Sequence, residues 1–310
     1  MIQVIAMTRA IAFITIGVLL ANIIVETGIL ARFGVFTAGI CRISNLSHRS
    51  VLSLLTCIMS STSGKSMLAE FYNRGEVGRT ETVLTVVMST FPVVVGESLF
   101  RVHAPIAIGL LGPAVGGTYV ALTLFAAFIQ TLGALIASRV LLSRTRSDVV
   151  AEPSKQEPIA LNWQIIKKGA EQAYPTLRKI VPILLVSMLT IEALLNLGLG
   201  VYIAQAFSPI LNLLGLPGDV IYALIAQFLH FSAGYAAIHT MLLEGVVTEK
   251  QAILTLLIGS MVVITMIYVK YSFSMYVSLF GRLGFTITAI HYLSSMIAKI
   301  ITIAVVVVWY

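Results

Sequence analysis

In the stretch SVLSLLTCIMSSTSGKSMLAEFYNR (residues 50–74), an apolar run is broken near its centre by the small polar sequence SSTSGKS. A second stretch, DVIYALIAQFLHFSAGYAAIHTMLLE (219–244), is broken in the same way by HFSAGY. A helix that crosses a membrane needs about 20 mostly apolar residues in one run, whereas shorter runs are typical of re-entrant segments. We therefore predict that each stretch forms two half-helices joined as a re-entrant helical hairpin.

The composition supports a lipid environment. Hydrophobic residues make up 58% of the 310 residues, charged residues make up 11%, and the mean hydropathy is +0.98. A soluble domain has about 25% charged residues, so these values exclude soluble enzymes and disordered chains. The net charge of +7 is interpreted as a marker of membrane topology, not of nucleic-acid binding. Cys41 and Cys57 have no metal-ligand spacing, so we expect no metal site and no cofactor.

The charges also predict the orientation of the chain. Positively charged residues collect in cytoplasmic loops. If the N-terminus lies outside and both hairpins return to their side of entry, fifteen of the 20 Lys and Arg lie on one side and three on the other. This topology places both termini outside the cell membrane and the polar linker 142–173 in the cytoplasm. The uninterrupted spans that we expect are 10–31, 81–100, 117–141, 177–200, 251–271 and 286–309.

The two halves of the chain match each other at a constant offset. Gly64 corresponds to Gly234, Gly75 corresponds to Gly245, and the sequence VLTVV at 83–87 corresponds to ILTLL at 253–257. We therefore predict an all-α polytopic membrane protein built from two repeat units, 1–141 and 174–310. Each unit has one hairpin and about three membrane-spanning helices. Because each unit crosses the membrane an odd number of times, the second unit is inverted relative to the first. Although residues 1–26 resemble a signal peptide, the repeat favours a retained span at 10–31.

Inverted repeats with interrupted helices are a signature of secondary transporters, whose binding sites lie near the middle of the membrane. The glycine-centred hairpins, followed by GVVTEKQAILTLLIGS (245–260) and GEVGRTETVLTVVMST (75–90), resemble the gate or nucleoside-recognition family of membrane proteins. That family includes spore-maturation proteins and the gate domains of ferrous-iron permeases, with concentrative nucleoside transporters as distant relatives. The resemblance implies paired hairpins around a central site, but SSTSGKS does not match the carboxylates with which nucleoside transporters contact their substrate.

The hairpin tips carry the candidate substrate-binding residues. A half-helix that starts just after Gly64 would direct free N–H groups toward an anion. A lysine at this depth costs about 2.5–3.5 kcal/mol, so we expect Lys65 to face either an anionic solute or one of the carboxylates of Glu26, Glu97 and Glu192. The SGKS sequence lacks the first glycine of a phosphate-binding loop. The predicted substrate-binding residues are Ser61, Thr62, Ser63, Gly64, Lys65, Ser66, His230, Ser232, Gly234 and Tyr235.

Two pairs of polar residues mark the helices that precede the hairpins. Asn22 and Glu26 lie four residues apart, hence on one helical face, and Glu192 and Asn196 repeat that spacing at the corresponding place in the second half. These faces could bind a coupling ion or carry protons. They could equally form interhelical hydrogen bonds that join the repeats. Both interpretations stay open at this point.

These observations predict a secondary transporter, not an enzyme. It would move a small polar, anionic solute between the hairpin tips by alternating access, with coupling to H⁺ or Na⁺ as an option. The expected partners are the solute and the lipid bilayer, without nucleic acid, and self-association is left open. The alternatives with the same fold are a nucleoside or metal-ion permease or pore, and a non-transporting membrane assembly subunit of the gate family. An intramembrane enzyme lacks support because no motif has catalytic spacing.

Overall fold

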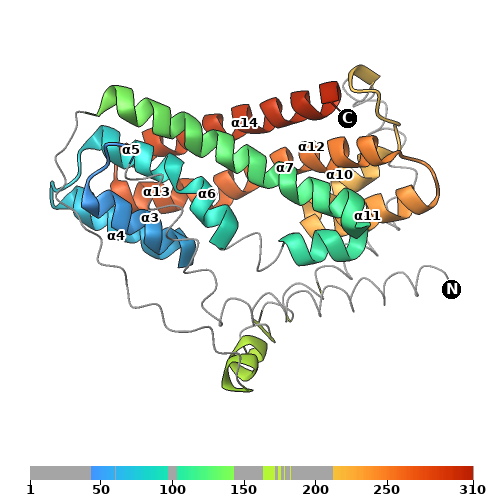
Figure 1. Ribbon diagram of the computed structural model, residues 1–310, viewed down its shortest axis with the longest axis horizontal. Coiled ribbons are helices and arrows are strands. Elements are labelled where there is room, and N and C mark those ends of the chain that lie inside the picture. Colours follow the sequence, from blue (N-terminus) through green and yellow to red (C-terminus); the bar gives the residue numbers. More distant parts are fainter. Residues whose placement is uncertain are drawn as a thin grey trace.

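The computed structural model describes residues 43–59, 61–96, 103–142, 163–171, 174–175, 178, 182 and 212–309 (Figure 1). The expected span 10–31 and nearly all of the span 177–200 lie outside this set. Asn22, Glu26, Glu192 and Asn196 therefore also lie outside the described residues. Within the described ranges every regular element is a helix.

In the described part of each half, a helical hairpin comes first and a long helix comes last. In the first half the elements are α3 (His48–Met59), α4 (Ser61–Asn73), α5 (Arg79–Met88), α6 (Thr90–Val93) and α7 (Ala104–Leu141). In the second half they are α10 (Val220–Leu229), α11 (Phe231–Leu243), α12 (Glu249–Ile267), the π-helix η2 (Tyr268–Ser272), α13 (Phe273–Phe280) and α14 (Leu283–Trp309). Helix α7 contains a kink at Gly112, where φ is 77°, and α13 is separated from α14 at Gly281, where φ is 56°.

The second arms of the two hairpins begin and turn at corresponding positions. Helices α4 and α11 both have 13 residues, and they begin at Ser61 and Phe231. The turn after each hairpin contains a glycine in the left-handed region, with φ of 72° at Gly75 and 70° at Gly245. The offset between these glycines equals the offset between the two helix starts. A residue with a β-carbon is disfavoured at such a φ, which explains why glycine occupies both positions.

The two arms of each hairpin approach closely at a glycine. A β-carbon built on Gly64 would lie 2.3 Å from Cys57 Sγ and 2.7 Å from the backbone N of Cys57. A β-carbon on Gly234 would lie 2.5 Å from Cβ of Gln227 and 2.9 Å from its Cα. Cys57 and Gln227 stand at corresponding positions of the two halves, as the glycines do. Only glycine lets the second arm lie this close to the first, which explains its place in both hairpins.

Each hairpin packs against the last helices of the other half. Helix α4 contacts α13, and α11 contacts α7. One buried core joins Ile106, Ala107 and Leu110 of α7 to α10, α11 and α12. A second joins α4 and α5 to α13 and the start of α14. In Figure 1 the pair α3–α4 lies toward the left and the pair α10–α11 toward the right, with α7 and α14 running between them.

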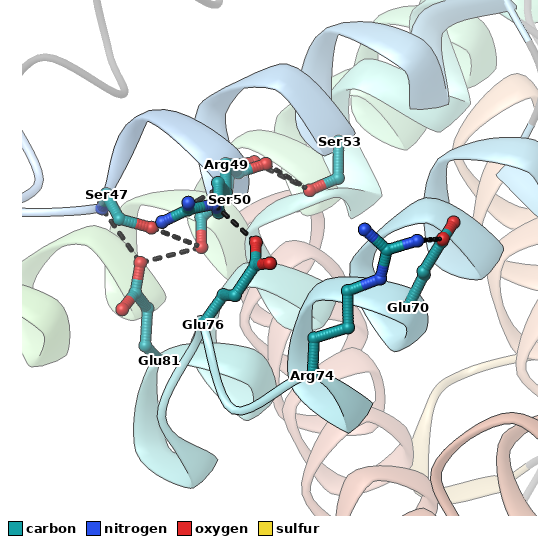
Figure 2. Close-up of polar contacts among 8 residues, drawn as sticks. All are labelled: Ser47, Arg49, Ser50, Ser53, Glu70, Arg74, Glu76 and Glu81. Carbon is teal, nitrogen blue, oxygen red and sulfur yellow. Dashed lines mark hydrogen bonds and ion pairs between the residues drawn. The ribbon is translucent and has the colours of Figure 1, made fainter.

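The base of the first hairpin is fixed by polar contacts with the start of α5 and with the turn between α4 and α5 (Figure 2). Glu81 accepts hydrogen bonds from the backbone N of Ser47 at 2.8 Å and from Ser50 Oγ at 2.6 Å. Arg49 forms an ion pair with Glu76 at 2.5 Å, and Arg74 pairs with Glu70 on α4. Because Glu81 occupies the first turn of α5 and bonds the start of α3, it holds the entry to the hairpin.

Among the described residues, the two helices Ala104–Leu141 and Leu283–Trp309 are long and apolar enough to cross a membrane. Only 28% of the apolar window of each is buried inside the protein, so most of their apolar surface faces outward. On α14 the outward residues Leu293, Ile297 and Ile300 are more than half exposed, at 57%, 58% and 56%. Such an apolar stripe is unfavourable in water and suits a lipid surface. This arrangement supports a membrane location.

The helix bounds differ from the sequence predictions in three places. Helix α4 begins at Ser61, so Gly64 and Lys65 lie inside the helix; the predicted half-helix starting just after Gly64 is wrong. The predicted span 81–100 is divided at Ser89, between α5 and α6. The span expected at 117–141 belongs to a longer helix, which begins at Ala104 with Pro105 in its first turn. Proline is well tolerated there, since its missing N–H has no helical partner at that place.

We predict that Gly64→Ala and Gly234→Ala each destabilise the protein by about 1–3 kcal/mol, because the added methyl group overpacks the hairpin. Thermal unfolding of the purified protein in detergent measures this. Gly133→Ala is the matched control: a β-carbon on this helical glycine meets nothing within 4 Å, so the control should be neutral or slightly stabilising. If all three variants unfold at the same temperature, the arms do not approach as described.

Candidate functional site

The structure places most of the predicted tip residues on the first turns of α4 and α11. Lys65 is buried, with 8% of its surface exposed, while Thr62 and Ser66 are exposed. Ser61 is partly buried, and the side chain of Ser63 is not among those described. On α11, Ser232, Gly234 and Tyr235 are buried. The tip residues therefore face two ways, some into the protein and some away from it.

The buried side of the first hairpin belongs to a polar cluster that we call the His291 cluster, formed by Lys65, Thr90, Tyr276 and His291. Lys65 Nζ lies 5.3 Å from the centroid of the Tyr276 ring, in the range of a cation–π interaction. Lys65 is also within electrostatic range of His291. The tyrosine hydroxyl lies 2.9 Å from His291 Nδ1, and Thr90 Oγ1 lies 2.9 Å from His291 Nε2.

The hydrogen bonds fix the tautomer of His291. Thr90 Oγ1 donates its proton to the carbonyl oxygen of Val87 at 2.8 Å, so the same oxygen accepts from Nε2–H of His291. The imidazole Nδ1 is then the acceptor for the Tyr276 hydroxyl. His291 is thereby satisfied as a neutral ring. It also connects α6 in the first half to α13 and α14 in the second half.

A second layer of polar groups holds the backbone around His291. Gln130 on α7 donates from Nε2 to the carbonyl oxygen of His291 at 3.3 Å and to Ser294 Oγ at 2.8 Å. Ser295 Oγ donates to Gln130 Oε1 at 3.1 Å. Gln130 is buried, and these contacts use both ends of its amide. The bonds therefore fix the relative position of α7 and α14 next to the cluster.

The second hairpin contributes to a separate group, the His103 cluster, formed by His103, Tyr119, Tyr235, Ser260 and Lys299. His103 Nδ1 lies 3.2 Å from the Tyr235 hydroxyl, which donates to the Tyr119 hydroxyl at 3.4 Å. Lys299 Nζ donates to Ser260 Oγ at 2.8 Å. Tyr119 lies close to Ser260, and His103 is within electrostatic range of Lys299. The cluster thus connects α11, α12 and α14 to α7.

His230 occupies the break between α10 and α11 with an extended backbone, at φ −160° and ψ 133°. Its Nδ1 lies 2.7 Å from Ser232 Oγ and 3.3 Å from the backbone N of Ser232. The imidazole therefore caps the first turn of α11. Its ring lies 4.5 Å from the Phe231 ring, and Phe231 also stacks on His103 at 4.7 Å. His230 thus caps α11 at the tip and lies adjacent to the His103 cluster.

The two clusters occupy corresponding places in the two halves. Lys65 of the first half corresponds to Tyr235 of the second, and Thr90 corresponds to Ser260 at the same offset. In each case a residue of the hairpin meets residues supplied by the last helices of the other half. The clusters contain cationic groups and hydroxyl donors, which suit an anion or a neutral polar solute. Within the described residues no group of His, Cys, Asp and Glu could hold a metal ion.

Sequence reasoning did not select the residues that the hairpin tips meet in these clusters. Ionisable residues inside apolar helices are a functional signal in themselves, and His291 and Lys299 carry that signal within the predicted span 286–309. His103 and the tyrosines carry no such signal in the sequence. The ion pairs considered for Lys65 with Glu26, Glu97 and Glu192 involve carboxylates outside the described residues. The residues missed in this way are Thr90, His103, Tyr119, Ser260, Tyr276, His291 and Lys299.

In the part of the chain that the structure describes the fold is all-helical, and two of its helices are long and apolar enough to cross a membrane. The chain is 38% identical over 304 residues to the uncharacterized protein MJ0880 of Methanocaldococcus jannaschii, with 98% of both chains covered. It belongs to the same protein family. Two further proteins of that organism are similar: the uncharacterized proteins MJ0871, at 27% identity with 93% of this chain and 89% of the relative covered, and MJ1556, at 22% identity with 81% and 78% covered.

No family model matches the chain, so membership of the gate family stays a prediction. A solved structure, that of CNTnw in an inward-facing substrate-bound state, aligns with 99% of this chain and 96% of that chain. The TM-score is 0.31 and the identity is 12%. A likeness this distant carries no argument about the site.

We predict that Tyr276→Phe destabilises the protein by about 1–3 kcal/mol, because it leaves the buried Nδ1 of His291 without its donor. The measurement is thermal unfolding in detergent. Tyr271→Phe is the matched control, since Tyr271 is 69% exposed; it should not change the unfolding temperature. Equal stability of the two variants would contradict the hydrogen bond from Tyr276 to His291.

Proposed function

We propose that this chain is a secondary membrane transporter, not an enzyme, which moves a small polar, anionic solute between its two hairpin tips by alternating access. The observation that carries the proposal is the cross-packing of the hairpins. Each hairpin rests on the last helices of the other half, so a shift of one half relative to the other changes the surroundings of both tips. That coupling is what a carrier with two alternately open sides needs.

The proposed architecture is an inverted repeat with one re-entrant hairpin in each unit. The helix starts and the glycine turns, which match at one constant offset between the halves, support a repeat. The distribution of Lys and Arg in the sequence supports opposite insertion of the two units. In this topology the tips of the hairpins meet near the middle of the bilayer. A broken helix is tolerated there because surrounding protein covers its free backbone groups.

The proposed binding site lies between the tip residues at 61–66 and those at 230–235. Lys65 would supply the charge for the solute, supported by its burial and by the cation–π contact with Tyr276. The exposed hydroxyls of Thr62 and Ser66 supply further donors on the other side of the same turn. Coupling to H⁺ or Na⁺ would involve Asn22, Glu26, Glu192 and Asn196, as the sequence suggests.

We predict that proteoliposomes containing the protein give a substrate-dependent current or uptake for an anionic metabolite. Solid-supported-membrane electrophysiology with a panel of carboxylates, nucleosides and phosphorylated solutes measures this. Protein-free liposomes are the control for leakage. A panel that gives no response from any of these solutes would contradict the transporter proposal. If crosslinking the hairpins leaves the flux unchanged, the chain is a pore, because only a carrier needs both hairpins to move.

We predict that Lys65→Ala lowers the apparent affinity for the transported anion about tenfold or more, because a charge-assisted hydrogen bond contributes about 1.5–3 kcal/mol. Initial uptake rates at varied solute concentration measure the change. Lys250→Ala removes a lysine that bonds the carbonyl oxygen of Val307, and it should leave the affinity unchanged. Unchanged affinity in Lys65→Ala would assign this lysine to structure.

We predict that a cysteine introduced by Ser154→Cys, in a Cys41→Ala and Cys57→Ala background, is labelled only from the cytoplasmic side. The linker 142–173 carries five of the 20 Lys and Arg, and in the proposed topology it should stay inside. A membrane-impermeant maleimide, applied to intact cells and to inverted membranes, measures the accessibility. Labelling in intact cells would reverse the proposed orientation.

A further inference from the structure

Lys299 is a buried lysine that forms no ion pair with any carboxylate in the part of the chain that the structure describes. The residue is 6% exposed and lies far inside α14, which runs from Leu283 to Trp309. Its described hydrogen bond goes to the neutral hydroxyl of Ser260, at 2.8 Å. An ammonium has three N–H donors, so one contact of this kind leaves most of its capacity unused.

The described groups around Lys299 are hydroxyls and an imidazole, and none of them carries a negative charge. The Ser260 hydroxyl gives its own proton to the carbonyl oxygen of Leu257 at 2.6 Å. Tyr119 lies close to Ser260, and His103 lies within electrostatic range of Lys299. Among the residues that the structure describes, every Asp and Glu is exposed or partly exposed and none is buried. A buried cation without a counter-charge is expensive, because a neutral acceptor offsets only part of its desolvation cost.

We propose that Lys299, Ser260 and Tyr119 form a binding site for a small monocarboxylate, which supplies a negative charge that no carboxylate of the described residues supplies there. A single ammonium balances one negative charge, so a dianion such as phosphate would leave an uncompensated charge in the protein interior. A carboxylate has two oxygens that accept in one plane, which matches the ammonium on one side and a hydroxyl on the other. This inference rests on the proposed transport of an anion and narrows its class.

The site also has a place in the fold that suits a transported solute. The His103 cluster joins Tyr235 of the second hairpin to Tyr119 and His103 of the first half. A carboxylate bound at Lys299 and Tyr119 would therefore sit beside the contact between the hairpin and the opposite half. Binding there would alter the hydrogen bond between Tyr119 and Tyr235, which is already long at 3.4 Å.

The test uses the full-length purified protein in detergent, with binding of radiolabelled L-lactate measured by scintillation proximity. Thermal unfolding is recorded in parallel with sodium lactate, neutral lactamide, sodium phosphate and sodium chloride at equal ionic strength. We expect lactate to bind and to raise the unfolding temperature. Lactamide, phosphate and chloride should have no comparable effect. A response to phosphate or chloride equal to that of lactate would overturn the class of ligand, and no response to lactate would overturn the site.

Lys299→Met is the decisive variant, because methionine keeps much of the length of the side chain and removes the charge. We expect it to weaken lactate binding about tenfold or more. Without lactate it should be at least as stable as the parent protein, since an uncompensated buried charge has been removed. Marked destabilisation, or failure to fold, would identify Lys299 as part of a structural ion pair and overturn the proposal.

Two further variants test whether lactate binding depends on the residues of the site or only on the net charge of the protein. Ser260→Ala keeps the charge and removes the acceptor that positions it, so it should weaken lactate binding less than Lys299→Met does. Lys250→Met removes a lysine from α12 that is outside the cluster, and it should leave binding unchanged. Equal loss of binding in Lys250→Met and Lys299→Met would mean that only net charge matters and would overturn the site.

The outcome also distinguishes this inference from the transport proposal. Binding in detergent requires no vesicle and no gradient. Lysine-dependent lactate binding without any flux in proteoliposomes would support the site and contradict the transporter. Conversely, flux of an anion with the same affinity in the parent and in Lys299→Met would support the transporter and overturn the site.

Discussion

The close approach of two helical arms at a single glycine is the contact on which the rest of the structure depends. With a larger residue at position 64 or 234 the arms would separate, and the residues beside the glycine would no longer face the other half. Lys65 directly follows one of these glycines and Tyr235 directly follows the other. Because both side chains are buried against helices of the opposite half, the backbone contact at the glycine sets the position of a polar group in the interior.

The polar clusters then explain why the halves hold together as they do. Apolar helices in lipid gain little from hydrophobic association, so packing of small residues and interhelical hydrogen bonds carry much of the specificity. Here the bonds run between halves: Thr90 to His291, Gln130 to Ser294, and Tyr235 to His103. The partners in each pair are far apart along the chain. These bonds orient the two halves relative to each other, with hydrophobic cores filling the space between.

Sequence reasoning predicted the local features of the fold and missed the long-range ones. The breaks in the two hairpins, the matched glycines and the helical class could all be read from residue patterns, because each depends on neighbours along the chain. The start of α4 was placed after Gly64 and lies instead at Ser61, since serines and threonines near a glycine are typical of a loop. The pairing of His291 with Thr90, and of His103 with Tyr235, depends on which distant helices pack together, and single-sequence periodicity carries no information on that.

The hydroxyls of Thr90 and Ser260 stand at corresponding positions, yet one meets an imidazole and the other an ammonium. The same scaffold position therefore carries a neutral partner in one half and a charged partner in the other. A protein with two equivalent halves would present the same chemistry to both sides of a membrane. In this chain the two positions are not equivalent: the Thr90 hydroxyl meets an imidazole and the Ser260 hydroxyl meets an ammonium, although each cluster contains one lysine and one histidine.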